Sequence, residues 1–187
     1  MNLSHYIELK AIPQADMMQA EVISHLMQQI HRRLPTYAGR IGTAFPGYSQ
    51  QRTLGGIIRL FGSRADIQQL HDALQTLADY ALIDAPAAVP STHRHAVFAR
   101  WQPKGQSDRR RAESRLKAQG LSDSEICQRL YNKQLKQTDL RIPFVQMYSS
   151  STGQHFPLWI TCRSKSQMQT GLFNSYGLSH TTTVPAF

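Results

Sequence analysis

The sequence predicts an α+β protein: an N-terminal domain in which strands and helices alternate, and a C-terminal β-rich domain with an arginine-rich helix. Three observations lead to this prediction. Hydrophobic residues recur at strand spacing and then at helix spacing through residues 1–90. Surplus positive charge occurs only after residue 93, and Pro90-Ser91-Thr92 separates the two compositions. We therefore expect domains at residues 1–92 and 93–187, which a chain of 187 residues is long enough to form.

The N-terminal domain is expected to run strand, helix, strand, strand, helix, strand. Residues 6–12, 40–45, 54–61 and 81–90 have the pattern of strands, residues 16–34 have that of a helix, and Ser63 can cap a second helix whose apolar stripe ends at Leu77. The order βαββαβ is that of the ferredoxin-like domain, which common RNA-recognition modules share.

The C-terminal domain is expected to place two helices among several strands. The helices are predicted at residues 108–119, where Gly120 ends the pattern, and at residues 122–137, where Ser122 and Glu125 form a capping-box signal. The predicted strands cover residues 95–102, 143–149, 155–163 and 172–187.

Charge is the clearest indicator of a partner. Residues 1–93 carry seven Lys or Arg and seven Asp or Glu, whereas residues 94–187 carry fourteen and five, with the densest run at residues 100–117. Clustered cations of this kind release counterions from a polyanion, so the pattern favours a nucleic-acid partner. The alternative is a solvent-exposed basic surface that binds no nucleic acid.

Several classes of protein are disfavoured. No apolar run approaches the length of a membrane span, and the first ten residues lack the core of a signal peptide, so we expect a cytoplasmic protein. Cys127 and Cys162 do not form a C-x-x-C pair, which disfavours a zinc ribbon. Gly55-Gly56 is not followed by Lys-Ser or Lys-Thr, so a phosphate-binding P-loop is not indicated.

The second half offers three candidate RNA-contacting features. In the arginine-rich helix, Arg111 and Arg115 share one face while Arg110 and Lys117 lie on the next, a ridge suited to phosphates. Arg100 and Gln102 point to the same side of a strand and could read guanine and adenine, or simply extend the charged surface. Residues 149–156 combine hydroxyls with an aromatic that could stack on a base, although a polar hairpin turn has the same composition.

The candidate chemistry centres on His31, beside the apolar stripe near the end of the first long helix. No carboxylate pair stands at the spacing that two-metal nucleases need, so we expect neither a metal nor another cofactor. A nuclease of this kind would cut RNA, because a histidine can take the proton of a 2′-hydroxyl that attacks the adjacent phosphate. The alternative is that His31 is structural.

Four segments together resemble the type I-F CRISPR repeat-processing endoribonucleases. They are Leu140–Ile160, the tail made of residues 176–179 with Val184, Pro185 and Phe187, residues 40–46, and the Arg-x-Gln that precedes the arginine-rich helix. The resemblance covers the whole chain. It implies a metal-independent endoribonuclease that binds the stem-loop of CRISPR repeat RNA, cuts at the 3′ base of the stem and remains on the product hairpin. The alternative is a non-catalytic hairpin adaptor of the same fold.

The resemblance also implies roles for individual residues and partners. His31 would act on the 2′-hydroxyl or the leaving oxygen, Ser149 would hold that hydroxyl, and Tyr176 would orient the imidazole. The products would be a 5′-hydroxyl and a 2′,3′-cyclic phosphate or its opened phosphate. Expected partners are the repeat RNA and other subunits of the type I-F surveillance complex. The residues expected to bind RNA are Arg100, Gln102, Arg109, Arg110, Arg111, Arg115, Lys117, Ser151, Thr152 and Phe156.

Overall fold

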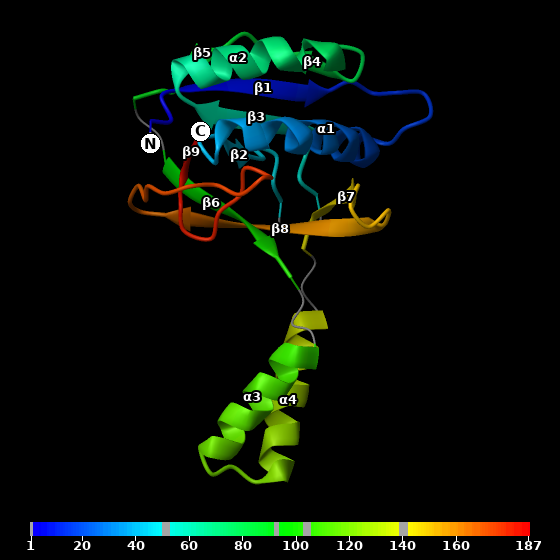
Figure 1. Cartoon of the computed structure of the whole chain (residues 1–187), viewed down its shortest axis with the longest axis vertical. Coiled ribbons are helices and arrows are strands. Elements are labelled where there is room, and N and C mark those ends of the chain that lie inside the picture. Colours follow the sequence, from blue (N-terminus) through cyan, green and yellow to red (C-terminus); the bar gives the residue numbers. More distant parts are fainter. Residues whose placement is uncertain (1, 50–52, 92–93, 103–105, 139–141) are drawn as a thin grey trace. The chain divides into compact units, whose positions relative to one another are not determined.

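The computed structural model of the chain describes residues 2–49, 53–91, 94–102, 106–138 and 142–187 (Figure 1). Contacts divide it into two compact units, one made of Met1–Trp101 with Ile142–Phe187 and the other of Gln102–Arg141. Strands and helices are mixed in the first unit, which confirms the α+β class. The first unit includes residues on both sides of the predicted boundary between residues 92 and 93. The domains expected at residues 1–92 and 93–187 remain a prediction.

The N-terminal part of the first unit has the predicted order of strands and helices. Its elements are β1 (His5–Ala11), α1 (Gln19–Arg33) with a 3-10 turn (Leu34–Tyr37), β2 (Gly42–Ala44), β3 (Ile57–Gly62), α2 (Arg64–Leu74) with a 3-10 turn (Gln75–Leu77), β4 (Ala81–Ile83) and β5 (Ala87–Ala88). The strands form an antiparallel sheet in the order β2-β3-β1-β4, and β5 also pairs with β1. The prediction of one strand over residues 81–90 is wrong: the chain leaves the sheet between Ile83 and Ala87, and Pro86 has no N–H for a ladder.

A second antiparallel sheet lies in the same unit, in the order β7-β8-β6-β9. Its strands are β6 (Arg94–Trp101), β7 (Phe144–Tyr148), β8 (His155–Lys165) and β9 (Val184–Ala186). The prediction of strand over residues 172–187 is correct only for β9. Before it the chain folds into loops, because side chains such as those of Asn174 and Ser179 bond to nearby backbone N–H groups in place of a strand ladder.

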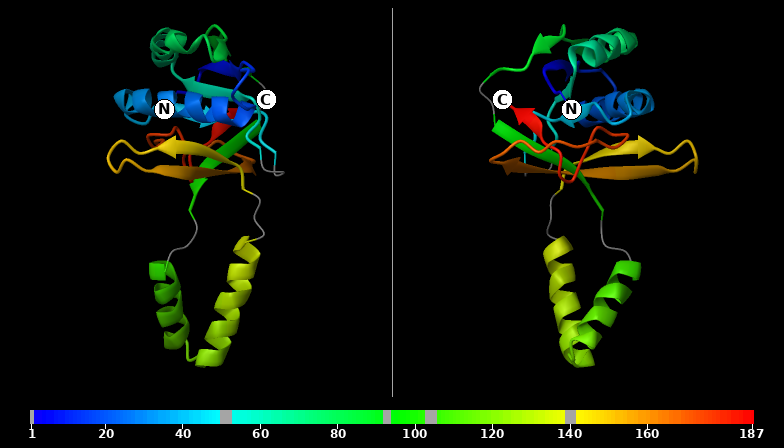
Figure 2. Two further views of the ribbon diagram at one scale, coloured as in Figure 1. Left: turned by 90° about the vertical axis from the view of Figure 1, so that its right-hand side faces the viewer. Right: turned by 60° about the vertical axis from the view of Figure 1, so that its left-hand side comes forward.

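Helix α1 lies between the two sheets and joins their cores (Figures 1 and 2). Its apolar side chains recur at helical spacing, and one continuous cluster links them to both sheets. The cluster includes Ile7 and Leu9 from β1, Leu26 and Met27 from α1, and Val145, Met147 and Leu158 from the second sheet. The polar side of α1 is thereby held at a fixed place beside the second sheet.

The second unit is a pair of helices, α3 (Gln106–Ala118) and α4 (Asp123–Thr138), close to the predicted ranges. Gly120, with a φ of 79°, ends α3 in the left-handed conformation that glycine favours. The predicted capping box begins α4: the Ser122 N–H donates to Glu125 Oε2 at 3.0 Å, and the Glu125 N–H points back to Ser122 Oγ at 3.5 Å. Over the described ranges, no helix combines the length and the apolar character needed to cross a membrane.

The start of α2 carries an electrostatic contact that should depend on pH. Arg40 donates to both Asp66 carboxylate oxygens, at 2.9 and 3.1 Å, and Ser63 Oγ–H donates to Oδ2 at 2.8 Å. The Arg40 hydrogen bonds, supported by Ser63, lower the pKa of Asp66 below its ordinary value of 3.8. The ionised carboxylate therefore stabilises the fold above that value, and this stabilisation is lost as pH falls through the lower pKa of the folded state.

We expect Asp66→Asn to weaken the loss of stability on acidification. Denaturant unfolding at pH 7 and pH 3 should show a larger difference for the wild-type chain than for Asp66→Asn. The matched control is Asp72→Asn, at an exposed carboxylate on the same helix. A wild-type difference that Asp66→Asn leaves unchanged would show that the Arg40 contact does not contribute to acid sensitivity.

Candidate active site

His31 is held in one orientation at the end of α1. Its Nδ1 lies 2.8 Å from the main-chain oxygen of Ser175, 144 residues away in the sequence. Because a carbonyl oxygen only accepts hydrogen bonds, Nδ1 carries the proton. In the neutral ring Nε2 is then left with a lone pair, which is the form that a general base needs.

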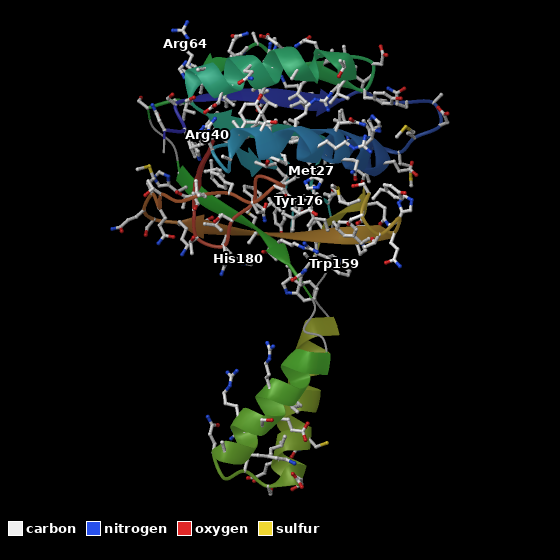
Figure 3. All side chains as sticks on the ribbon, in the orientation of Figure 1. Met27, Arg40, Arg64, Trp159, Tyr176 and His180 are labelled. Atoms are coloured by element: carbon white, nitrogen blue, oxygen red, sulfur yellow. The ribbon has the colours of Figure 1, made fainter. Side chains whose placement is uncertain are left out.

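Tyr176 covers the His31 ring. The two rings stack with their centroids 4.3 Å apart and an angle of 16° between their planes. Figure 3 shows Tyr176 between α1, marked there by Met27, and the second sheet. The stacking and the Ser175 hydrogen bond act on different parts of the imidazole, so together they restrict both its tilt and its rotation.

Arg100 links this pair of rings to Phe156. The Arg100 guanidinium carbon lies 5.8 Å from the Tyr176 ring centroid and 5.8 Å from the Phe156 ring centroid. Both distances suit a cation–π contact. The structure thus brings four of the predicted residues, His31, Tyr176, Arg100 and Phe156, into one chain of contacts.

The loop that presents Ser175 and Tyr176, residues 173–179, closes on itself through Asn174. Its Oδ1 accepts from the N–H groups of Tyr176 at 2.9 Å and Leu178 at 3.1 Å, and its main-chain oxygen accepts from the Gly177 N–H at 2.9 Å. Sequence reasoning missed Asn174. The available signal was its spacing before Gly177, since asparagine side chains stabilise such turns.

The same loop is docked onto the first sheet through Gly177. The Thr43 N–H of β2 donates to the Gly177 main-chain oxygen at 2.8 Å, and Gly177 has a φ of 72°. A Cβ at this position would overlap Thr43 Oγ1, a buried hydroxyl with no hydrogen-bond partner among the described residues. Thr43 lies in a strand predicted from the sequence and in a segment that resembles the family, but the sequence assigned it no role at the site.

Ser149 begins the turn from β7 to β8, residues 149–154, called here the Ser149 turn. Its N–H donates to the Gln154 main-chain oxygen at 2.9 Å, and its own main-chain oxygen accepts from the Gly153 N–H at 2.8 Å. The Ser149 hydroxyl lies 3.1 Å from Ser151 Oγ and accepts from the Thr152 N–H at 3.3 Å. Ser149, Ser151 and Thr152, all predicted to contribute, therefore form one polar turn.

The remaining predicted residues belong to the second unit. Gln102 is exposed, and Arg111 and Arg115 of α3 are also exposed. Arg109 and Arg110 belong to the same helix, but their side chains lie outside the described part of the structure. Lys117 is engaged in ion pairs with Asp123 at 3.2 Å and Glu113 at 3.7 Å, and the Asp123 hydrogen bond raises its pKa above the ordinary value.

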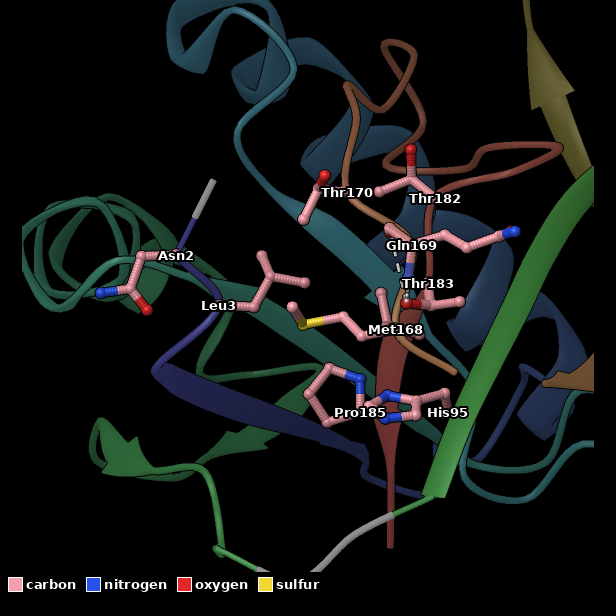
Figure 4. Close-up of a pocket in the computed structure, with 10 residues that line it drawn as sticks. Asn2, Leu3, His95, Met168, Gln169, Thr170, Thr182, Thr183 and Pro185 are labelled. Atoms are coloured by element: carbon pink, nitrogen blue, oxygen red, sulfur yellow. Dashed lines mark hydrogen bonds between the residues drawn. The ribbon is translucent and has the colours of Figure 1, made fainter. Parts of the chain in front are cut away.

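A separate cavity of about 250 Å³ lies beside β6 and β9 (Figure 4). Its walls include Asn2, Leu3, His95, Gln169, Thr182 and Pro185, and none of its lining residues is a predicted site residue. Within the described ranges, no three His, Cys, Asp or Glu side chains gather closely enough to hold a metal ion. The candidate chemistry therefore rests on the His31 contacts and not on this cavity.

Comparison with known proteins identifies the family. The family model described as CRISPR-associated protein (Cas_Csy4) matches residues 6–187. The chain is 32% identical over 190 residues to the CRISPR-associated endonuclease Cas6/Csy4 of Pseudomonas aeruginosa (strain UCBPP-PA14), with 99% of this chain and 100% of that protein covered. It is 31% identical over 189 residues to the protein of the same name from Escherichia coli (strain UTI89 / UPEC), with the same coverage. The resemblance seen in the sequence is thus confirmed, and the chain belongs to the Csy4 family of CRISPR-associated proteins.

Proposed function

We propose that this protein is a metal-independent endoribonuclease that binds the stem-loop of CRISPR repeat RNA and cuts at the 3′ base of the stem. The observation that carries the proposal is His31, whose Nδ1 is tied to the Ser175 main-chain oxygen while Tyr176 stacks on its ring. Support for the reaction class comes from the two relatives, both named endonucleases. The order βαββαβ of the first strands and helices supports a ferredoxin-like N-terminal domain.

The proposed reaction begins at Nε2, the unprotonated ring nitrogen of neutral His31. Nε2 takes the proton of the 2′-hydroxyl before the scissile bond, the 2′-oxygen attacks the phosphorus, and the bond from phosphorus to the 5′-oxygen breaks. The leaving 5′-oxygen takes a proton from water and becomes a 5′-hydroxyl, while the other fragment ends in a 2′,3′-cyclic phosphate. The imidazolium then returns its proton to the solvent. The Ser175 oxygen stabilises the imidazolium that forms, and the Ser149 hydroxyl orients the 2′-hydroxyl for attack in line with the leaving oxygen.

The contacts of Arg100 suggest how the end of the stem meets the reacting groups. Phe156 offers a ring on which the last base pair can stack, and such stacking contributes roughly 1–3 kcal/mol per base. Arg100 lies within cation–π distance of both Phe156 and Tyr176. A guanidinium in this position can bond to a guanine edge and still contact the ring that covers His31.

The arginine-rich helix α3 supplies the phosphate-binding surface of the proposal. Arg111 and Arg115 are exposed and one helical turn apart, as a ridge that follows phosphates requires. Such contacts hold an RNA hairpin without taking part in cleavage. They also favour slow release of the product, consistent with a nuclease that stays on its hairpin as a subunit of the type I-F surveillance complex.

We expect Arg115→Ala and Lys117→Ala to change the salt dependence of RNA binding unequally. Arg115→Ala should reduce the slope of log Kd against log salt by about 1, because one phosphate contact is lost. Lys117→Ala should reduce it by less than half of that, since Asp123 and Glu113 already pair with the ammonium. Equal reductions, measured by filter binding from 50 to 300 mM salt, would show that these ion pairs open fully on RNA binding.

The function is tested with the cognate repeat RNA in excess chelator. Cleavage should continue, should stop when the nucleotide before the scissile bond carries a 2′-deoxy sugar, and should leave a 2′,3′-cyclic phosphate. Cleavage that chelator abolishes would overturn the metal-independent mechanism. Tight binding without any cleavage would support the hairpin adaptor instead, and equal binding of unrelated hairpins would exclude recognition of one repeat.

A further inference from the structure

We infer that Gln28 is a positioning residue for cleavage, which sets the place of the Ser149 turn beside His31. The side-chain amide of Gln28 clamps the peptide groups of Tyr148, the residue directly before Ser149. The inference rests on the proposed function, since it assigns Gln28 a part in the reaction of His31 and Ser149.

The clamp closes the open edge of a sheet. Strand β7 is the edge strand of the second sheet, with β8 along one side. On its other side the Tyr148 N–H donates to Gln28 Oε1 at 2.8 Å, and Gln28 Nε2 donates to the Tyr148 main-chain oxygen at 3.2 Å. An amide side chain can do this because it carries one acceptor and one donor group in the arrangement of a peptide. Gln28 thus stands in for a residue of a neighbouring strand.

A third hydrogen bond shows that α1 and β7 run in the same direction. The Gln146 N–H of β7 donates to Ser24 Oγ at 3.0 Å, one helical turn before Gln28. From Ser24 to Gln28 the helix rises about 6 Å, and from Gln146 to Tyr148 the strand rises about 6.6 Å. The two steps match and have the same direction along the chain.

The same alignment extends to the reacting groups. Ser24, Gln28 and His31 follow one another at intervals of four and three residues, so they share one face of α1. On the strand, the residue after Tyr148 is Ser149. Ser149 and His31 thus follow the Gln28–Tyr148 contact, one on each element, which is the arrangement on which the inference rests.

The Ser149 turn moves with Tyr148 because its own hydrogen bonds keep it together. The Ser149 N–H and main-chain oxygen are both bonded inside the turn, to Gln154 and Gly153. The imidazole is held separately, by Ser175 and Tyr176. Loss of the clamp should therefore change the distance between the Ser149 hydroxyl and the imidazole while leaving the tautomer of His31 intact. A misplacement of about 1 Å can lower a rate by about a hundredfold.

The first arm of the test compares Gln28→Met with Ser24→Ala. Methionine keeps the length of the side chain without its amide, and Ser24→Ala removes a hydrogen bond to the same strand, farther from Ser149. We expect Gln28→Met to slow single-turnover cleavage of the cognate repeat RNA by about tenfold or more. Its Kd for uncleavable 2′-deoxy RNA should stay within about twofold, and Ser24→Ala should cut within about threefold of the wild-type rate.

The second arm uses Gln28→Glu, whose carboxyl group resembles the amide only when it is protonated. The ionised form accepts from the Tyr148 N–H but repels the Tyr148 main-chain oxygen, whereas the protonated form can donate to that oxygen. The cleavage rate of Gln28→Glu relative to wild type should therefore rise as pH falls from 8 to 5. The relative rate of Gln28→Met should stay flat. A residue that only stabilises the fold would not produce this difference.

The outcomes separate this inference from the function on which it rests. Wild-type cleavage that fails in chelator would overturn the proposed mechanism. Chelator-resistant wild-type cleavage with an equally fast Gln28→Met would overturn only the role of Gln28. The role of Gln28 would also be overturned if Gln28→Met and Ser24→Ala lost cleavage rate and melting temperature in parallel. A relative rate of Gln28→Glu that does not change with pH would have the same meaning. In both cases Gln28 would only stabilise the packing of β7 on α1.

Discussion

Replacing His31 with alanine should slow cleavage of the cognate repeat RNA by about 10²–10⁴, the usual contribution of a positioned general acid or base. The affinity for the hairpin should change by no more than about twofold, because the proposed RNA contacts come from other residues. The large effect follows from the Ser175 hydrogen bond, which occupies Nδ1 and leaves Nε2 as the only nitrogen of the ring able to take a proton.

His25 provides a matched control on the same helix. It too lies against a tyrosine, with its ring centroid 4.4 Å from that of Tyr80. His25→Ala removes the same side chain from α1 and a comparable ring contact, so it should keep most of the cleavage activity. Single-turnover rates and Kd values with 2′-deoxy RNA distinguish the two variants. If His31→Ala lost binding together with cleavage, or if His25→Ala were equally slow, His31 would be a structural residue.

Gly177→Ala should lower both stability and cleavage, even though the substitution adds a single methyl group. The new Cβ would overlap Thr43 Oγ1 and lie 2.9 Å from Thr43 Cβ and 3.0 Å from Thr43 N, at a φ of 72° that alanine rarely adopts. Strain of this kind costs roughly 1–3 kcal/mol. Since Gly177 follows Tyr176 directly, relief of the overlap would shift the ring and the Ser175 oxygen that hold His31, and we expect cleavage to fall by about tenfold to a hundredfold.

Two variants separate the overlap from the backbone strain in this prediction. Gly153 has a φ of 66°, but its nearest neighbour would be Tyr148 Oη at 3.9 Å, so Gly153→Ala introduces the left-handed strain with open space around the methyl group. It should reduce the melting temperature less than Gly177→Ala does. Thr43→Ala in the Gly177→Ala background removes the overlapping hydroxyl and should restore part of the lost stability. Equal destabilisation at the two glycines would mean that Thr43 does not constrain the loop.

The helices were the most predictable part of the fold, because their signals are local. Ser63 caps α2 by accepting from the Asp66 N–H at 3.2 Å, and Ser122 with Glu125 begins α4, both as the sequence indicated. Capping and helical periodicity involve residues within four positions of one another, so they can be recognised without knowledge of the rest of the chain. The strand predictions were less accurate in two places. Near Pro86 the chain leaves the first sheet, and around Asn174 side-chain hydrogen bonds form a loop in place of a strand.

For the candidate site, the sequence pointed to the residues of the proposed reaction but not to the residues that hold them. The position of His31 beside an apolar stripe, the serine-rich turn and the family resemblance identified the residues of the proposed reaction. Asn174 left a local signal, its spacing before Gly177, because it bonds to N–H groups only two and four residues ahead. Thr43 and Gln28 had no local signal for their roles, because the backbone groups that they contact lie far along the chain. Gln28 and Tyr148 are 120 residues apart, and no local pattern predicts that an amide side chain will meet that peptide.

The α+β class, the concentration of positive charge after residue 93 and membership of the Csy4 family follow from the amino-acid sequence alone, since periodicity, charge and motifs are properties of neighbouring residues. The folded chain was needed to see that the Ser175 oxygen fixes the His31 tautomer, that Tyr176 covers its ring and that Gln28 joins α1 to β7. These contacts join residues that lie far apart along the chain. Hydrogen bonds and ring stacking act over a few ångströms, and folding brings together groups separated by 120 to 144 residues.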